Sequence, residues 1–129
     1  MMLNSLVRYI DKSAERLPDK TAVRDDEKAY TYSELRTTAR KAASYLVKLN
    51  SECERRPVMV FLPRCVDAIV CFMGALYSGN PYVPVNYALP DVRLSSTLSN
   101  LSPLCVITDN DGREKINAIA PLVKSVTFS

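Results

Sequence analysis

The sequence predicts an α/β domain built on a mostly parallel sheet. From residue 58 onward, short apolar segments alternate with helical patterns, which indicates right-handed strand–helix–strand crossovers. Two of the apolar segments, Val58–Leu62 and Leu104–Thr108, lack the polar alternation of a half-exposed strand and are typical of strands buried on both faces. The 129 residues, 47% hydrophobic and 24% charged, suit one globular domain.

The first third of the chain predicts a helix followed by a hairpin. The helix ends before Pro18, because a residue that precedes proline disfavours the helical region. Its apolar residues recur at helical spacing: Leu3, Leu6, Val7, Ile10, Ala14 and Leu17. Two short strands, Thr21–Arg24 and Ala29–Thr31, then flank the polar turn Asp25–Lys28.

A capping box predicts where the next helix begins. The hydroxyl of Thr31 can accept from the amide of Glu34, whose carboxylate can accept from the amide of Thr31 in return. The expected apolar face of this helix is Leu35, Ala39, Ala42, Leu46 and Leu49. This helix also carries four cations, which form either a basic binding patch or its solvent-exposed face. We favour the solvent-exposed face. They are Arg36, Arg40, Lys41 and Lys48.

After the first apolar strand, the segment Val66–Ser78 predicts a helix that is apolar nearly all round. Asp67 is its one charged residue, so we expect other elements to cover it on more than one side. Gly79 is placed to cap its C-terminus. The strand expected at Tyr82–Val85 is short or lies at an edge, because Pro84 cannot donate to a ladder.

The last third predicts helix, strand, helix and strand. Pro90 and Asp91 begin the first helix, and its expected inward residues are Val92, Leu94, Leu98 and Leu101. After the second apolar strand, Asp109–Gly112 is expected to form a turn. The last helix is predicted from Ile116, Ala118, Ile119 and Leu122. A final strand is expected at Val126–Phe128.

Composition excludes several classes of site. The chain has no His, which rules out Ser-His-Asp and Cys-His arrangements and His-based metal sites. Its three glycines cannot form a dinucleotide-binding fingerprint. Gly74 and Gly79 have the spacing of a phosphate-binding loop, but Asn80 and Pro81 follow where Lys and Ser or Thr are needed, so we interpret the spacing as coincidence. A net charge of +3 does not favour nucleic acid as a partner.

The four cysteines, Cys53, Cys65, Cys71 and Cys105, have neither disulfide-framework nor zinc spacing. Cys71 and Cys105 lie in apolar runs and are expected to be small buried hydrophobes, whereas Cys53 lies in a polar stretch and is expected to be exposed. Arg64 could lower the pKa of the Cys65 thiol and make it reactive. A packing role for Cys65 at the helix start is favoured over a reactive one.

No targeting segment is visible in the sequence. The N-terminus lacks the basic and apolar regions of a signal peptide, and the longest apolar run, Ala68–Tyr77, is too short to span a membrane. We therefore expect a cytoplasmic protein without a membrane partner.

Two stretches resemble the first two core motifs of the adenylate-forming, or AMP-binding, enzymes. They are Tyr30–Leu35 and Leu76–Asn86, the second followed by Pro90, Arg93 and Leu94. That superfamily includes peptide-synthetase adenylation domains, acyl-CoA synthetases and D-alanine–carrier-protein ligases. The departures from its motifs are Tyr30 for Leu, Tyr77 for Lys, Pro81 for Ala and Asn86 for an acid. The sequence of Pro81–Pro84 is most similar to that of the amino-acid-activating members, particularly the D-alanine ligases.

The resemblance implies that residues 1–129 are the N-terminal part of an AMP-binding (adenylation) domain whose remainder is absent. The parent enzyme would activate a carboxylate, such as an amino acid and in particular D-alanine, as an acyl-adenylate. It would use ATP and Mg and pass the acyl group to the phosphopantetheine thiol of a carrier protein. The family's phosphate loop, nucleotide contacts, metal-binding acid and catalytic lysine lie downstream. We therefore expect no catalytic, cofactor-binding or metal-ligating residue in this chain, no bound cofactor and no activity of the chain alone.

Two alternatives stay open at this stage. The chain could be a self-contained α/β module that binds a nucleotide or a protein without catalysis, since a doubly wound sheet can bind nucleotides without glycine signatures. It could also be one piece of a split enzyme. As a fragment, it would leave surface of the helix Val66–Ser78 uncovered for the missing C-terminal remainder, and that surface would promote self-association.

Overall fold

The structure is a computed structural model that describes residues 2–50, 55–63 and 65–128. The helices are α1 (Met2–Arg16), α2 (Tyr32–Leu49), α3 (Val66–Tyr77), α4 (Asp91–Leu101) and α5 (Asn110–Ile119). The strands are β1 (Thr21–Arg24), β2 (Ala29–Thr31), β3 (Val58–Phe61), β4 (Tyr82–Pro84), β5 (Cys105–Thr108) and β6 (Ser125–Thr127). β1 and β2 form a separate antiparallel hairpin, as the sequence predicts.

The other four strands form a parallel sheet in the order β4-β3-β5-β6. Met59 in β3 pairs with Val83 on one side and with Val106 on the other. β3 and β5 are buried along their whole length, which confirms that these apolar segments are central parallel strands. Pro84 ends β4 at the edge of the sheet, where a missing amide donor is tolerated.

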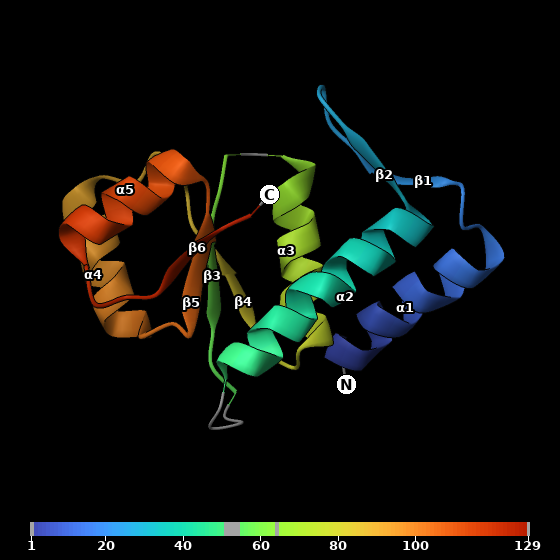
Figure 1. The fold of residues 1–129 in the computed structure, drawn as a ribbon, viewed down its shortest axis with the longest axis horizontal. Helices are drawn as coiled ribbons and strands as arrows, with labels where there is room; N and C mark the ends of the chain where they lie inside the picture. The colour runs from blue at the N-terminus through green and yellow to red at the C-terminus, as the bar shows by residue number, and fades with distance from the viewer. Residues whose placement is uncertain (1, 51–54, 64, 129) are drawn as a thin grey trace.

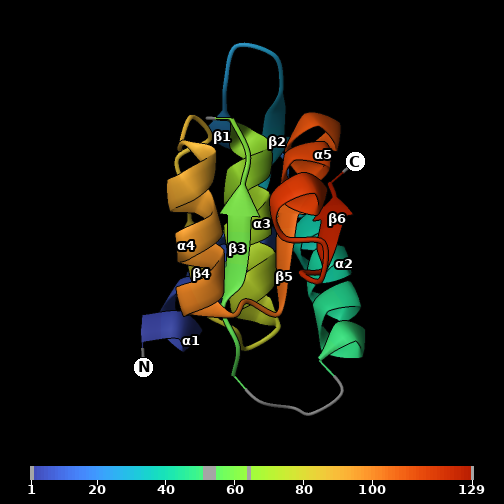
Figure 2. The ribbon, with the colours of Figure 1, turned by 90° about the vertical axis from the view of Figure 1, so that its left-hand side faces the viewer.

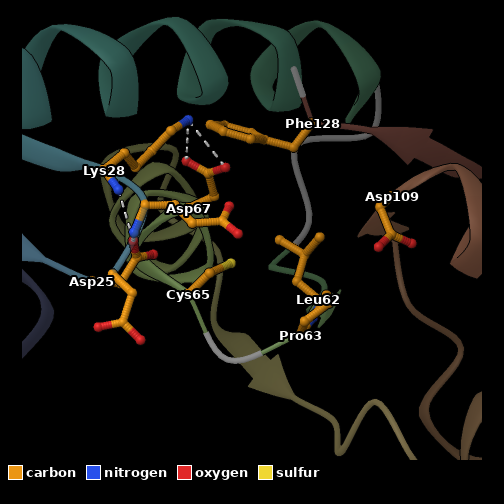
Figure 3. A pocket seen from close by; sticks show the side chains of 10 residues that line it. Asp25, Lys28, Leu62, Pro63, Cys65, Asp67, Asp109 and Phe128 are labelled. Carbon is orange, nitrogen blue, oxygen red and sulfur yellow. Dashed lines mark hydrogen bonds and ion pairs between the residues drawn. The ribbon is translucent and has the colours of Figure 1, made fainter.

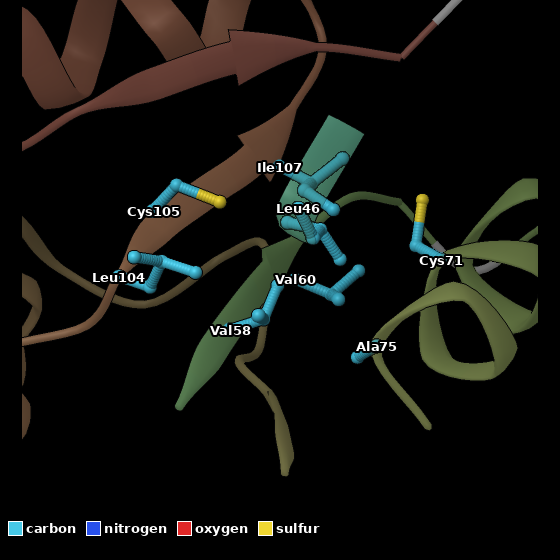
Figure 4. Close-up of a cluster of buried hydrophobic side chains, with 8 residues drawn as sticks. All are labelled: Leu46, Val58, Val60, Cys71, Ala75, Leu104, Cys105 and Ile107. Atoms are coloured by element: carbon cyan, nitrogen blue, oxygen red, sulfur yellow. The ribbon is translucent and has the colours of Figure 1, made fainter. Parts of the chain in front are cut away.

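Helices cover both faces of the sheet, so the prediction of an α/β fold with a mostly parallel sheet is confirmed. Figure 1 shows α2 and α3 on one face and α4 and α5 on the other. Val58 and Val60 point to the α2–α3 side, where they belong with Leu46, Cys71 and Ala75 to the core cluster that Figure 4 shows. The alternate residues of β3 pack against α4 and α5, in the cluster Met59, Phe61, Leu94, Leu98, Val106 and Ile116.

α3 is covered on two sides, as its composition predicts. Cys71 and Ala75 face the sheet, while Val70 and Met73 face α1 and α2 in a second cluster. The helices approach closely at Gly74, where a Cβ atom would lie 2.8 Å from the Cβ of Ala42. Small residues on both helices therefore allow α2 and α3 to pack together.

The predicted helix ends at the hairpin and around α3 are confirmed. The Thr31 hydroxyl accepts from the Glu34 amide at 3.1 Å, and the Glu34 carboxylate accepts from the Thr31 amide at 2.9 Å. Gly79 follows α3 with a φ of 84°, and its amide donates to the carbonyl of Leu76. This left-handed conformation favours glycine.

Three predictions about the last third are wrong. Val92 is 82% exposed, because a residue two positions from Leu94 lies about 200° around the helix. Leu122 lies beyond the end of α5 and is fully exposed. Pro121 follows the last turn of α5, and a residue before proline disfavours the helical region. Asp109–Gly112 is the start of α5 rather than a turn, because the Asp109 carboxylate accepts from the Gly112 amide at 2.8 Å.

Two smaller differences concern helix faces. Ala43 is buried in α2, while the expected Ala42 is only half-buried beside α3. Ala118 is exposed on α5, where Ile116 is the buried side chain. In both helices the buried face is set by which neighbour packs against it, which local periodicity does not specify.

Candidate functional site

A cavity of about 430 Å³ lies at the carboxyl ends of the central strands. α3 follows β3 on one face of the sheet and α5 follows β5 on the other, so these adjacent strands form a topological switch point. Open parallel sheets bind ligands at such a point. Figure 3 shows the lining residues, which are Asp25, Asp26, Glu27, Lys28, Leu62, Pro63, Cys65, Asp67, Asp109 and Phe128.

Asp25, at the end of β1, ties the hairpin to the start of α3. One of its oxygens accepts from the amides of Glu27 and Lys28, each at 2.8 Å. The other accepts at 2.9 Å from the amide of Val66, the first residue of α3. These bonds, that of Val66 foremost, lower the pKa of Asp25. Asp25 therefore caps α3 from a distant part of the chain, and the N-cap residue Cys65 makes no side-chain cap bond.

Asp67 makes the second tie between the hairpin and α3. Its carboxylate lies 3.1 Å from Lys28 Nζ and accepts from the hydroxyl of Tyr30 at 2.7 Å. The hydrogen bond to Asp67 raises the pKa of Lys28. Burial, followed by the bond to Asp67, raises the pKa of Tyr30. The single charged residue of an apolar helix is thus used to hold the hairpin.

Asp109 has a structural role on the opposite side of the cavity. Besides capping α5, it accepts from the hydroxyl of Tyr87 at 2.6 Å. Burial, with a smaller contribution from this bond, raises the pKa of Tyr87 to about 12. The ring of Tyr87 packs on that of Phe61, with centroids 4.9 Å apart, which fixes the loop after β4 over the end of β3.

An apolar hollow of about 470 Å³ adjoins this cavity and shares Leu62, Pro63 and Cys65 with it. Its further walls come from α3, which contributes Phe72, and from the chain after β4, which contributes Val85. The crevice therefore has an acidic half next to the hairpin and an apolar half next to β4. The three lining carboxylates that form hydrogen bonds are those of Asp25, Asp67 and Asp109. Each of them holds a helix end, the hairpin or a loop in place, which is a structural role.

The described residues do not fit ATP or Mg. Five carboxylates and one lysine line the acidic half, a balance that repels phosphate. No group of three or more His, Cys, Asp or Glu residues in the described ranges could hold a metal ion.

The cysteines lie largely where the sequence predicts. Cys71 and Cys105 are buried, and burial raises the pKa of both thiols, that of Cys105 to about 11. Cys65 is partly buried and lines both hollows. Cys53 and Arg64 lie outside the described residues, so the exposure of Cys53 and the effect of Arg64 on Cys65 stay predictions.

The cations of α2 mostly form its solvated face, as favoured above. Arg40, Lys41 and Lys48 are exposed and Arg36 is half-buried. Arg40 pairs with Asp11 of α1 at 3.1 Å and so helps to join these two helices. No helix within the described ranges is both long and apolar enough to cross a membrane.

Three of the residues that depart from the AMP-binding motifs form hydrogen bonds within the fold. The hydroxyl of Tyr30 donates to Asp67, and that of Tyr77 donates to Asp11 at 2.7 Å. Asn86 accepts from the amide of Ala88 at 2.9 Å and shapes the turn after β4. Sequence reasoning missed these contacts, although the lone charge of Asp67 on an apolar helix was a usable signal.

Comparison with known proteins matches residues 10–128 to the AMP-binding enzyme family. The D-alanine–D-alanyl carrier protein ligase of Listeria welshimeri is 28% identical over 115 residues, which are 89% of this chain and 22% of the ligase. The N-(5-amino-5-carboxypentanoyl)-L-cysteinyl-D-valine synthase of Penicillium rubens is 33% identical over 111 residues, which are 86% of this chain and 3% of the synthase.

A solved structure agrees with this result. The benzoate CoA ligase of Burkholderia xenovorans LB400 superposes with a TM-score of 0.81 and 26% identity, covering 94% of this chain and 24% of that one. The chain thus spans about a quarter or less of the relatives named here. Because the match extends over almost the whole chain, from α1 to the end of β6, this protein belongs to the AMP-binding enzyme family.

Proposed function

We propose that residues 1–129 are the N-terminal scaffold portion of an ATP-dependent ligase that activates a carboxylate as an acyl-adenylate. The family match over residues 10–128 supports this proposal, as does the small share of each relative that the chain spans. ATP and Mg would bind to the remainder of the enzyme, and the ligase would act in the cytoplasm, where both are supplied.

The observation that carries the scaffold role is how the crevice uses its carboxylates. Asp25 caps α3, Asp67 anchors the hairpin and Asp109 caps α5. Each is bonded to groups of the fold, which supports a structural role for all three. The acidic lining also weighs against the alternative of a self-contained nucleotide-binding module.

An amino acid, with D-alanine as the first candidate, is the proposed substrate, and the phosphopantetheine thiol of a carrier protein is the proposed acceptor. The named relatives support this choice, since one is a D-alanyl carrier protein ligase and the name of another gives it a product with cysteinyl and valine residues. The benzoate CoA ligase supports a broader carboxylate class and a CoA acceptor, so both have to be included in the test.

The test is ATP–pyrophosphate exchange with D-alanine, a panel of L-amino acids and benzoate. The product of the complete reading frame and the chain of residues 1–129 are assayed side by side. We expect exchange with an amino acid for the complete product and none for residues 1–129. Exchange by residues 1–129 alone would disprove the scaffold role, and a reading frame that stops at Ser129 would disprove the ligase.

A further inference from the structure

Another hollow, of about 650 Å³, lies at the end of the sheet opposite the crevice. Its lining includes Arg56, Leu104 and Lys124, which lie just before β3, β5 and β6 in the sequence. Figure 2 shows the amino ends of β3 and β5 at the bottom of the sheet, away from the hairpin. A volume of this size falls within the range of about 300–1,000 Å³ that is usual for small-molecule sites.

Two cations and no described acid line this basal hollow. The cations are Arg56 and Lys124, and neither forms an ion pair with another described residue. Burial raises the pKa of the Cys105 thiol and both cations oppose that effect, so both lie near the same buried sulfur. Two cations placed together in this way favour a ligand with more than one negative charge.

The end of α4 holds Arg56 in place. Its Nη2 atom donates to the carbonyl of Ser102 at 3.3 Å and to that of Pro103 at 3.1 Å. Its Nη1 and Nε atoms have no partner among the described residues. A guanidinium fixed through one nitrogen keeps its other N–H groups for an oxyanion, and its planar fork matches the oxygens of a phosphate.

The carboxyl ends of α4 and α5 also lie at the basal hollow, and a helix carboxyl end attracts cations. Arg56 meets this need at α4 with one of its nitrogens. Lys124 is exposed, and its side chain donates to no group that the structure describes. Its charge is therefore left for a ligand.

The basal hollow adds neutral donors and apolar surface to these charges. Ser95 and Ser99 lie about one turn apart on α4, and their hydroxyls form no hydrogen bond with another described residue. Ile119 and Leu122, from the end of α5 and the loop after it, contribute apolar surface, and Leu122 is fully exposed. A ligand that fills this hollow therefore has a charged part and an apolar part.

We propose that the basal hollow binds a phosphate monoester with an apolar group. The phosphate oxygens accept from Arg56, Lys124 and the two serine hydroxyls, and the apolar group covers Leu122. A phosphate monoester carries about −1.5 to −2 charges at pH 7, which matches two cations. This binding goes beyond the proposed function and does not depend on it, because the hollow shares no described lining residue with the crevice.

Isothermal titration calorimetry with phenyl phosphate tests the proposal on residues 1–129 at low salt. Inorganic phosphate has the charge without the apolar group, and benzyl alcohol has an apolar group without the charge. We expect phenyl phosphate to bind about tenfold more tightly than inorganic phosphate, and benzyl alcohol not to bind. No binding of phenyl phosphate, or equal binding of the two phosphates, would overturn the proposal.

Two variants test the cations one at a time. Lys124→Gln should weaken the binding of phenyl phosphate about tenfold, because it removes one of two charges. The backbone carbonyl of Lys124, which accepts from the Val106 amide, is kept. Arg56→Lys keeps the charge but loses the planar fork, and should also weaken binding about tenfold. Lys12→Gln removes an exposed charge on α1 and should leave binding unchanged. Full binding by both Lys124→Gln and Arg56→Lys would contradict the site.

Amide chemical shifts locate the ligand on the protein. Phenyl phosphate should shift the amides of Ser99 and Lys124 and leave those of Asp25 and Val85, at the crevice, unchanged. Shifts confined to the crevice would overturn the assignment. The product of the complete reading frame should bind phenyl phosphate as residues 1–129 do. Binding by residues 1–129 alone would instead show that the hollow is closed inside the complete enzyme, which also overturns the proposal.

Discussion

Gly112 determines how closely α5 approaches the sheet. A Cβ atom at this position would overlap the hydroxyl oxygen of Thr108 and lie 3.2 Å from the ring of Phe61. Thr108 cannot easily rotate away, because its hydroxyl donates to the Phe61 carbonyl at 2.6 Å in a fully buried site. Glycine is therefore required here by close packing within a helix rather than by a turn.

Gly112→Ala should lower the free energy of unfolding by about 1–3 kcal/mol, the usual cost of overpacking a core. Urea denaturation of the purified chain measures the change. The cost should be smaller in a Thr108→Ala background, where the overlapping oxygen is gone. Glu114→Ala, on the exposed side of the same helix, should change stability by less than about 0.5 kcal/mol. An equal cost in both backgrounds would mean that Thr108 is not the obstacle.

The hairpin β1–β2 is attached to α3 by polar contacts. Asp25 and Val66 are 41 residues apart in the sequence, and Lys28 and Asp67 are 39 apart. The folded-state pKa of Asp25 is below that of the unfolded chain. Its carboxylate therefore stabilises the fold above the unfolded value of about 3.9, and this stabilisation is lost as the pH falls through the folded-state value.

Asp25→Asn should lower the free energy of unfolding at pH 7, because an amide cannot accept from both sides of the original carboxylate. The difference from the unmodified chain should shrink as the pH falls below about 4. Urea denaturation across this range measures it. Asp26→Asn is the control: it removes the same charge from the same turn, but Asp26 makes no hydrogen bond to α3. It should have little effect on the free energy of unfolding. A difference that is constant with pH would contradict the role given to the Asp25 charge.

Elements defined by local chemistry were predictable from the sequence, and contacts between distant elements were not. The capping box at Thr31 and the hairpin both follow from residues close together in the chain. The cap that Asp25 supplies to α3 joins elements that no periodicity relates. The start of α5 was mistaken for a turn because Asp and Gly favour both structures, and the choice depends on Asp109 bonding the Gly112 amide.

For the molecule as a whole, Cys71 and Cys105 report on global unfolding. Both lie in the cluster between the sheet and its α2–α3 layer, and burial keeps their thiols protonated. In a Cys53→Ser chain we expect only Cys65 to react quickly with a thiol reagent under native conditions. Mass spectrometry of the labelled protein should show one modified thiol before unfolding and three afterwards. Rapid native labelling of Cys105 would contradict the buried position of β5.

The alternation of segments predicts the α/β class, but not the strand order or the site. β4 follows β3 in sequence and lies beside it, and β5 then takes the other side of β3. The residues of β5 do not indicate on which side of β3 this strand pairs. The crevice depends on that order, so it could not be located from sequence alone.

The central place of β3 also has a consequence for biosynthesis. Phe61 is joined to Thr108, 47 residues later, so β3 leaves the ribosome well before its second neighbour is made. During that interval β4, the N-terminal helices and, last, α4 are made and can cover the apolar β3 and α3, but β5 and α5 are still missing. We therefore expect the nascent chain to need chaperones most while the segment up to β5 is being translated.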